Sequence, residues 1–456
     1  MTGAASPAGP APRTLVLVLA PSLGILDSWL PVLADARVTM PDTRIVAVVP
    51  ERRTVLAVDP SDTMVRLAEE VVDEVIVPAV DGAMLRAPGL VAARELLERE
   101  RLATAVARLV DAARWRLGRA RRHGPMPSWQ RALLRPLRPR AVRRAVVDLA
   151  AHIGTDAHVC YDVHVHRHPA SAALVASLGP LPRSSLHHGI DVLRDDGRRF
   201  PIPDIERDVA VGLFSELERD AYRGVHGLTD PVLDVVGIPR HDPAWMRRVI
   251  ATSAQLHRPP SEDVVFVLSR PAGTSYLPAD RKVASLAALH RVVCEQYGMT
   301  LVVKLHPKER DDGTIAAGLP PSMEGRSWHR VRAHPFHVAE HALAAVAFHS
   351  GVLIDMVALG VPAIELIDVR GLPEHDRPDA PRDARGRPIH SALRAHGLVL
   401  PADDEEDLAR WMAEVRRDRA ALVDRLRTAY RAAFPDPDGA IAAVRAGLLR
   451  RGPARA

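Results

Sequence analysis

Short continuous apolar runs alternate along the chain with segments whose apolar residues recur at helical spacing. Apolar runs of about four to eight residues, bounded by Gly or Pro, predict strands that are buried on both faces. In the first half the predicted strands are 14–20, 44–50, 74–79, 157–163, 184–189, 209–215 and 233–239. In the second half they are 263–269, 300–307, 344–351 and 362–367. Strands that alternate with helices predict parallel sheets covered on both faces, so we expect an α/β fold.

The alternation restarts in the second half, which predicts two doubly wound, Rossmann-like parallel-sheet domains. Ligands bind such sheets at the carboxyl ends of the strands, so we expect the two domains to face a central cleft lined by the loops that follow the strands. The expected order is a disordered N-terminus over 1–12, a first α/β domain over 13–240, a linker over 241–262, a second α/β domain over 263–402, and C-terminal helices over 403–456.

The composition is that of a globular protein. The chain has 456 residues, enough for two cores, with 47% hydrophobic and 26% charged residues. It contains no apolar run of about 18 residues, which a membrane-spanning helix would need, and no apolar stretch typical of a secretion signal. With only two cysteines, a disulfide framework is excluded, and we expect a cytoplasmic location.

The positive charge is concentrated in one segment. Residues 112–145 contain 11 arginines and no acidic residue, and they include Trp115 and Trp129. A basic stretch with interfacial aromatic residues predicts a surface for anionic lipid, at the inner face of the membrane, or for a polyanionic polymer. A solvated helical hairpin in an arginine-rich chain is the alternative, and it stays open. We expect no nucleic-acid partner, because the sequence has no recognisable nucleic-acid-binding motif.

Three loops after predicted strands of the second half have the residues that a nucleotide diphosphate requires. Residues 269–270 stand beside a glycine turn, residues 304–306 end a strand, and residues 349–351 open a helix. The backbone N–H groups and dipole of a helix start favour phosphate, and an acidic side chain one turn later could accept ribose hydroxyls. The predicted donor-nucleotide residues are Arg270, Lys304, His306, His349, Ser350, Gly351 and Asp355.

The motifs VVGIPRHD (235–242) and TLVVKLHPKE (300–309), with the segment 337–366, resemble the GT-B nucleotide-sugar transferases. They are most similar to the branch of CDP-glycerol glycerophosphotransferases and of capsular polysaccharide transferases with CMP- or CDP-activated donors. The turn LHHG, which contains His188, is similar to a His-Gly turn late in the family's first domain. The resemblance spans 184–366. It implies a GT-B fold and group transfer from a nucleotide-sugar or CDP-polyol to a cell-surface polymer or lipid-linked acceptor, with no obligatory cofactor or metal.

The reaction requires a general base for the acceptor hydroxyl. His188, at a strand end of the first half, is our candidate, and Asp27, at the start of the first helix, is the rival. The residues predicted to line the acceptor side of the cleft are Ser22, Gly24, Asp162 and His164.

Three further hypotheses stay open. The alternating His164, His166 and His168 would share one face of a strand and could bind zinc, although the GT-B resemblance requires no metal there. A UDP-N-acetylglucosamine 2-epimerase has the same two-domain build and a similar Ser-Gly-helix turn. It needs paired acids, however, where this chain has Ile354 and Asp355. A non-catalytic protein that binds nucleotide or polymer is the third alternative.

Overall fold

In the computed structural model the described residues are 13–20, 23–79, 83–116, 146–163, 165, 169–189, 210–226, 233–273, 277–306, 309, 313–368 and 391–450. Contacts divide the chain into two units. Of the described residues, the first unit contains those up to Leu186, the single residue Ala210, and residues 445–450. The second unit contains the other described residues between His187 and Val444. The predictions for 1–12, Ser22, the three alternating histidines and residues 117–145 of the basic segment lie outside the described residues.

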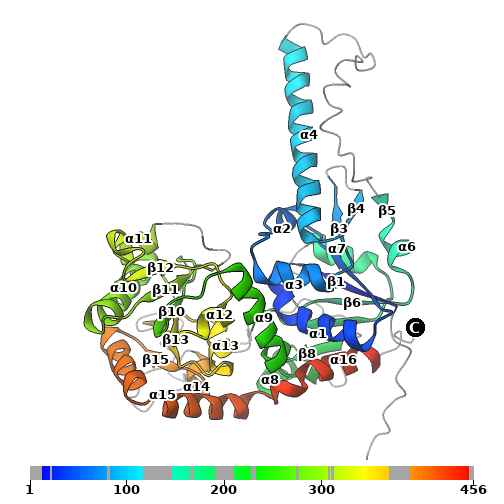
Figure 1. Cartoon of the computed structure of the whole chain (residues 1–456). Coiled ribbons are helices and arrows are strands. Elements are labelled where there is room, and N and C mark those ends of the chain that lie inside the picture. The colour runs from blue at the N-terminus through cyan, green and yellow to red at the C-terminus, as the bar shows by residue number, and fades with distance from the viewer. Residues whose placement is uncertain are drawn as a thin grey trace, which may run out of the picture. The chain divides into compact units, whose positions relative to one another are not determined.

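The first sheet has nine strands in the order β5-β4-β3-β2-β1-β6-β7-β8-β9 (Figure 1). Its central strand β1 pairs in parallel with β2 and β6, and it is buried along its whole length, as the apolar run 14–20 predicted. The strands are β1 (Thr14–Val18), β2 (Arg44–Val48), β3 (Glu74–Pro78), β4 (Met84–Ala87), β5 (Val146–Val147), β6 (Ala157–Asp162), β7 (Arg183–Leu186), β8 (Ala210–Leu213) and β9 (Leu233–Val235).

Two of these strands were not predicted. β4 runs antiparallel to β3 and β5 runs antiparallel to β4, so this edge differs from the parallel pairs on either side of β1. β4 has four residues and β5 only two, and neither forms an apolar run long enough to signal a strand.

Helices of the first unit pack on this sheet. Asp62 caps α3 by accepting hydrogen bonds from the backbone N–H groups of Met64 and Val65, at 2.8 and 3.3 Å. Trp29 of α1 donates from Nε1 to the backbone oxygen of Tyr161 at 3.1 Å, which joins α1 to the end of β6. The helices are η1 (Leu23–Ile25), α1 (Leu26–Thr39), α2 (Arg52–Leu56), α3 (Thr63–Val71), α4 (Leu90–Arg116), α6 (Leu149–Ile153) and α7 (Pro169–Ser177).

The second sheet has six parallel strands in the order β12-β11-β10-β13-β14-β15. Its central strand β10 is completely buried apart from a trace at Leu268, as expected where helices cover both faces. The strands are β10 (Val264–Leu268), β11 (Leu301–Lys304), β12 (Trp328–Arg330), β13 (Ala342–Ala347), β14 (Ala363–Leu366) and β15 (Leu400–Ala402).

The remaining helices include those that cover the second sheet and those that close the chain, which confirms the predicted helical C-terminal segment. Residues within the predicted linker 241–262 form the 14-residue helix α9. The elements are α8 (Glu216–His226), η4 (Pro239–His241), α9 (Pro243–Leu256), α10 (Ala279–Leu289), η5 (His290–Gln296), α11 (Thr314–Gly318), η6 (Pro321–Met323), α12 (Pro335–Ala339), α13 (Val352–Ala358), α14 (Ala392–Ala395), α15 (Glu405–Ala433), η7 (Pro437–Gly439) and α16 (Ala440–Arg450).

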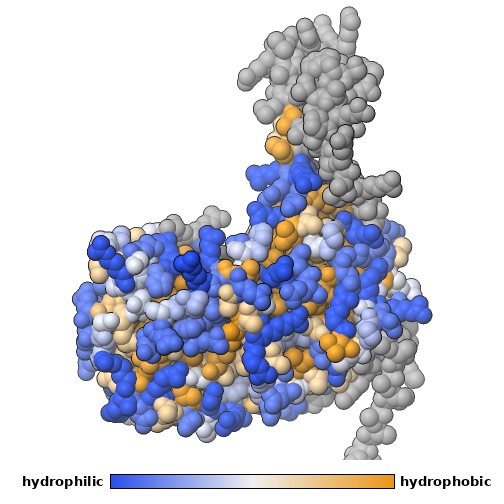
Figure 2. Space-filling view, in the orientation of Figure 1, coloured by the Kyte–Doolittle hydropathy of each residue, from blue (hydrophilic) through white to orange (hydrophobic). Residues whose placement is uncertain are grey.

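The surface is mainly hydrophilic on the face shown in Figure 2, with apolar residues scattered between polar ones. Within the described ranges, the large hydrophobic residues that are exposed are Val38 and Leu102. None of the helices in the described part of the chain is long and apolar enough to cross a membrane.

Candidate functional site

The predicted donor residues lie at one edge of the second sheet. Leu268 of β10 pairs with Lys304 of β11 and with Ala347 of β13, and Ala347 pairs with Glu365 of β14. These four residues form one row across the sheet. Three of the predicted residues each follow a member of this row by two positions: Arg270, His306 and His349. The parallel topology therefore brings all three to the carboxyl edge, where doubly wound sheets bind ligands.

His349 is held by a buried carboxylate. Its Nδ1 lies 2.9 Å from Oε1 of Glu365, which is completely buried in β14. The backbone of His349 has φ +53°, a left-handed conformation that is rare for a residue with a side chain and is typical of functional turns. Arg270 donates from Nη1 to the backbone oxygen of His349. The structure thus joins Arg270 and His349, both predicted, to Glu365, which was not.

Arg394 supplies the positive charge that balances Glu365. Its Nε lies 2.6 Å from Oε2 of Glu365, and its Nη1 lies 2.6 Å from Oδ1 of Asp403. It also donates from Nη2 to the backbone oxygens of Glu365, Ile367 and Ala402, at 3.0, 3.3 and 3.2 Å. Burial by itself would raise the pKa of Glu365, but the charge of Arg394, with the hydrogen bond from His349, lowers this pKa to about 2. Glu365 is therefore ionised at neutral pH.

A second buried carboxylate shapes the loop after β11. Glu309 accepts a hydrogen bond from Ser269 Oγ at 2.8 Å and one from the backbone N–H of His306 at 3.1 Å. Lys282 of α10 pairs with the same carboxylate, and both side chains are almost completely buried. Lys304 lies beside this loop and donates from Nζ to the backbone oxygen of Arg332 at 3.2 Å. The loops after β10 and β11 are thus tied together through Glu309.

Ser350 and Gly351 form the turn into α13, a helix of seven residues. The Oγ of Ser350 accepts a hydrogen bond from the backbone N–H of Val352 at 3.4 Å, and its backbone oxygen accepts one from Leu353 at 3.1 Å. Both residues are half-buried beside His349. The turn predicted from the sequence is therefore formed.

Asp355 belongs to a separate buried cluster. Its Oδ1 lies 2.9 Å from Nε of Arg240 and 2.6 Å from Nε2 of His241, and Nδ1 of His241 lies 2.8 Å from the hydroxyl of Tyr430 in α15. Burial opposes ionisation of Asp355, but Arg240 and His241 outweigh it and lower the pKa of this carboxyl. Asp355 of α13 thereby links residues 237–241 to α13, and His241 links the same segment to α15. The predicted contact with the ribose would be an additional role of this carboxylate.

The candidate base His188 is the second residue after the end of β7 and is half-buried. Its neighbour His187 is buried, with its ring centroid 6.1 Å from that of Phe214. The guanidinium of Arg240 lies 5.9 Å from the Phe214 ring centroid. Through Phe214, the turn that carries His188 is therefore packed near the cluster of Asp355.

The acceptor-side predictions lie in the first unit. Gly24 is in η1, Asp27 is half-buried in the first turn of α1, and Asp162 is the last residue of β6 and completely buried. The hydrogen bond from Trp29 to Tyr161 brings α1 beside the end of β6, so Asp27 and Asp162 belong to neighbouring elements. The predictions for Ser22 and His164 fall outside the described residues.

Several residues of the site were not predicted: Lys282, Glu309, Glu365, Arg394 and Asp403. Glu365 could have been noticed in the sequence, because it is a single acidic residue inside the apolar strand PAIELI (362–367). A charge in a buried strand needs a partner. Lys282 was a weaker candidate for such a role, because it is one of only three lysines in the chain.

No model of a protein family matches the chain, and neither does any curated protein. Solved structures do. The wall teichoic acid polymerase TagF matches with a TM-score of 0.54 at 11% identity, over 96% of this chain and 88% of that one. A protein assigned as a UDP-N-acetylglucosamine 2-epimerase from Listeria monocytogenes matches with a TM-score of 0.53 at 11% identity, over 95% and 94%. The chain has a GT-B-like fold.

A third structure, UDP-GlcNAc 2-epimerase from Neisseria meningitidis bound to UDP-GlcNAc, matches with a TM-score of 0.50 at 11% identity, over 96% of this chain and 99% of that one. The predicted fold class is confirmed, with two parallel-sheet α/β domains and a helical C-terminal segment. At this identity the likeness concerns the fold, and a fold of this kind hosts several activities.

Proposed function

We propose that the chain is a transferase that moves a group from a nucleotide-activated donor to an acceptor hydroxyl. The observation that carries the proposal is the network of Arg270, His349, Glu365 and Arg394 at the carboxyl edge of the second sheet. It lies where a doubly wound sheet binds nucleotides, and it combines cationic groups with a buried carboxylate that fixes one of them. The TagF structures, some of them soaked with CDPG, have the same GT-B-like fold.

The groups of this network at the carboxyl edge could stabilise the phosphate that leaves with the nucleotide. In the proposed step, the acceptor oxygen forms a bond to the transferred group, and the bond from that group to the nucleotide's phosphate oxygen breaks. The electron pair stays on the nucleotide. Arg270 and His349 would stabilise the charge that develops there, because fixed donors at a leaving oxygen need no reorganisation during the reaction. Glu365 assists, since its carboxylate is bonded to Nδ1 of His349 and so fixes the orientation of the imidazole ring.

The proton of the acceptor hydroxyl would pass to His188, the proposed general base. Asp355 would contact the donor ribose, with Lys304 and His306 near the phosphates. The finer proposal is a CMP- or CDP-activated donor and a cell-surface polysaccharide or teichoic-acid-like acceptor. The basic segment 112–145 would hold that acceptor or an anionic membrane surface.

A UDP-N-acetylglucosamine 2-epimerase-like isomerase is the second candidate. The likeness to two epimerase structures, at TM-scores close to that of TagF, favours it. The sequence opposes it, because Ile354 and Asp355 stand where paired acids are expected. The two activities differ in their products, since an isomerase changes a UDP-sugar without an acceptor and a transferase releases a nucleotide.

The test is a thermal-shift screen with CMP, CDP, UDP, GDP and their activated sugars or polyols, followed by product analysis of every donor that binds. A ligand that binds only the folded chain raises the Tm, by about 2.7 kcal/mol of stabilisation at 100 times its Kd. We expect CMP or CDP compounds to raise the Tm of the wild type and of His396→Ala, an exposed control, and to raise that of His349→Ala less. Formation of an epimerised UDP-sugar without acceptor would establish the isomerase instead, and no shift with any nucleotide would contradict both.

A further inference from the structure

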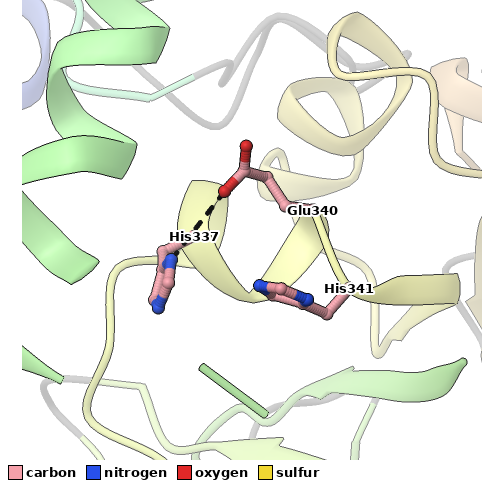
Figure 3. A group of neighbouring side chains, drawn as sticks. All are labelled: His337, Glu340 and His341. Carbon is pink, nitrogen blue, oxygen red and sulfur yellow. Dashed lines mark ion pairs between the residues drawn. The ribbon is translucent and has the colours of Figure 1, made fainter. Parts of the chain in front are cut away.

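A group of potential metal ligands lies at the opposite edge of the second sheet. His337 is in α12, and Glu340 and His341 follow it, directly before β13 begins at Ala342. One ligand atom from each residue can be chosen so that all three lie within 4.8 Å of one another. In Figure 3 the carboxylate of Glu340 and the ring of His341 both lie close to the ring of His337. From these residues we propose a binding site for a divalent transition-metal ion of the zinc class.

The local backbone explains the grouping. Residues three and four positions apart lie on the same face of a helical turn, so Glu340 and His341 both lie above His337. The turn continues past α12, since the backbone N–H of His341 donates to the oxygen of Val338 at 3.1 Å. Two histidines at this spacing are a common means by which a helical turn binds zinc.

His337 supplies an independent observation. The side chain is 3% exposed, yet within the described part of the chain neither Nδ1 nor Nε2 has a hydrogen-bond partner. The nearest carboxylate oxygen, Oε2 of Glu340, is 3.9 Å from Nδ1 and thus beyond hydrogen-bond distance. A buried imidazole without a partner is costly, and coordination of a metal ion would remove that cost.

The donor set selects the class of metal. Two imidazoles and one carboxylate suit Zn²⁺ and similar ions, whereas Mg²⁺ and Ca²⁺ prefer oxygen ligands alone. Glu340 is exposed, with 47% of its side chain accessible, so its carboxylate can move toward the two rings. Three protein ligands leave at least one position for water.

The site is distinct from the donor loops. It precedes β13, whereas His349 and its neighbours follow β13, so the two groups lie at opposite ends of that strand. α12 packs against α9, and the backbone N–H of His334 donates to Ser253 Oγ of α9 at 3.1 Å. A metal ion here would stabilise the turn 337–341, which packs beside α9 and leads into β13. We therefore expect it to affect the stability of the fold rather than donor binding.

The experiment uses the untagged full chain after removal of metals with EDTA. We expect Zn²⁺ to bind with one equivalent at this site and to raise the Tm, and Mg²⁺ to leave the Tm unchanged. Glu340→Gln should weaken Zn²⁺ binding at least about tenfold, the lower end of the effect of losing even an outer metal partner. Because Glu340 is exposed, this variant should fold normally, and Glu262→Gln, another exposed acid, is its matched control. His341→Gln should weaken binding in the same way.

The alternating histidines of the sequence are the competing zinc site. The triple variant His164→Gln, His166→Gln, His168→Gln should therefore keep the equivalent that Glu340→Gln loses. Co²⁺ titration gives a second readout, since a four-coordinate Co²⁺ ion absorbs strongly in visible light. The proposal is overturned if Glu340→Gln and His341→Gln bind Zn²⁺ as tightly as the wild type, if binding disappears only in the triple variant, or if the wild type binds none.

Discussion

The Nδ1 atom of His349 lies 2.9 Å from Oε1 of Glu365, a residue of the neighbouring strand. This bond fixes the orientation of an imidazole whose backbone is in a left-handed conformation, at the point where β13 turns into α13. Arg394 holds the other carboxylate oxygen. A side chain at the predicted donor edge is thus positioned by Glu365 of β14, which is held in turn by Arg394 of α14.

Glu365→Gln should destabilise the second unit, because it removes the negative charge that Arg394 and His349 share. Loss of one partner of a buried ion pair costs about 3–5 kcal/mol, and Asp403 keeps part of the pairing of Arg394, so we expect about 3 kcal/mol. Guanidinium unfolding measures the change. Glu262→Gln, at an exposed position, should stay within about 0.5 kcal/mol of the wild type, and an equally small effect of Glu365→Gln would contradict the assignment.

The lowered pKa of Glu365 predicts that the free energy of unfolding decreases at acidic pH. The pKa of Glu365 is about 2 in the folded chain against an ordinary value of 4.5, so its ionised form is favoured by folding. Its contribution is complete above about pH 4.5 and is lost as the pH falls toward 2. Across that interval the wild type should lose about 3 kcal/mol more than Glu365→Gln. Unfolding curves of both proteins between pH 5 and pH 2 test this, and parallel pH profiles would show that the carboxyl is not held ionised.

Lys282 and Glu309 should behave as a coupled pair. Lys282→Met leaves the Glu309 carboxylate buried without its cation, which should cost about 3–5 kcal/mol. Glu309→Gln in the same chain removes the uncompensated charge, so the double variant should be more stable than the sum of the single variants predicts. A double-mutant cycle by guanidinium unfolding measures the coupling, and additivity within about 0.5 kcal/mol would mean that the two residues do not interact.

Asp355→Asn separates the two roles considered for that residue. Loss of the charge beside Arg240 and His241 should lower the free energy of unfolding by about 3 kcal/mol. Tyr430→Phe removes only the hydroxyl that bonds to His241 and should cost about 1 kcal/mol. If Asp355 also contacts the ribose, Asp355→Asn weakens nucleotide binding and Tyr430→Phe does not. Equal nucleotide affinity in all three proteins would confine Asp355 to the buried cluster.

His188→Ala should abolish turnover and leave nucleotide binding almost intact, since a general base acts only in the chemical step. The expected loss in kcat is about 10²–10⁴-fold. Asp27→Asn is the comparison, because Asp27 is the rival base, and His396→Ala is the exposed control. Full turnover by His188→Ala, together with loss in Asp27→Asn, would assign the base to Asp27.

Most of the secondary structure of the sheets was predictable because it depends on local apolar runs. TLVLVLA and DVVFVLS form the central strands β1 and β10. Strands β4 and β5 at one edge of the first sheet, and the edge strands β12 and β15 of the second, were missed, because such short strands depend on pairing with their neighbours more than on their own sequence. The carboxyl-edge position of Arg270, His306 and His349 followed from topology alone, because parallel strands in register bring the residues after them together.

The partners of these residues were not predictable in the same way. Glu365 and Arg394 are 29 positions apart and meet only through the order of strands in the sheet. All but three of the 61 basic residues are arginines, so nothing local distinguishes Arg394 from the others. His241 and Tyr430 meet across 189 positions because η4 and α15 pack together through the cluster of Asp355. Contacts between residues so far apart depend on how the whole chain packs, which the local sequence does not show.

The last helix has a consequence for synthesis. Arg445 of α16 donates from Nη1 to Oδ2 of Asp35 in α1 at 2.6 Å, across 410 positions of the chain, and the residues from Arg445 onward belong to the first unit. On the ribosome, the nascent first unit can therefore form this contact only after residue 445 has left the exit tunnel. A chain cut before Arg445 would keep α1 but lack this contact between the two ends of the first unit.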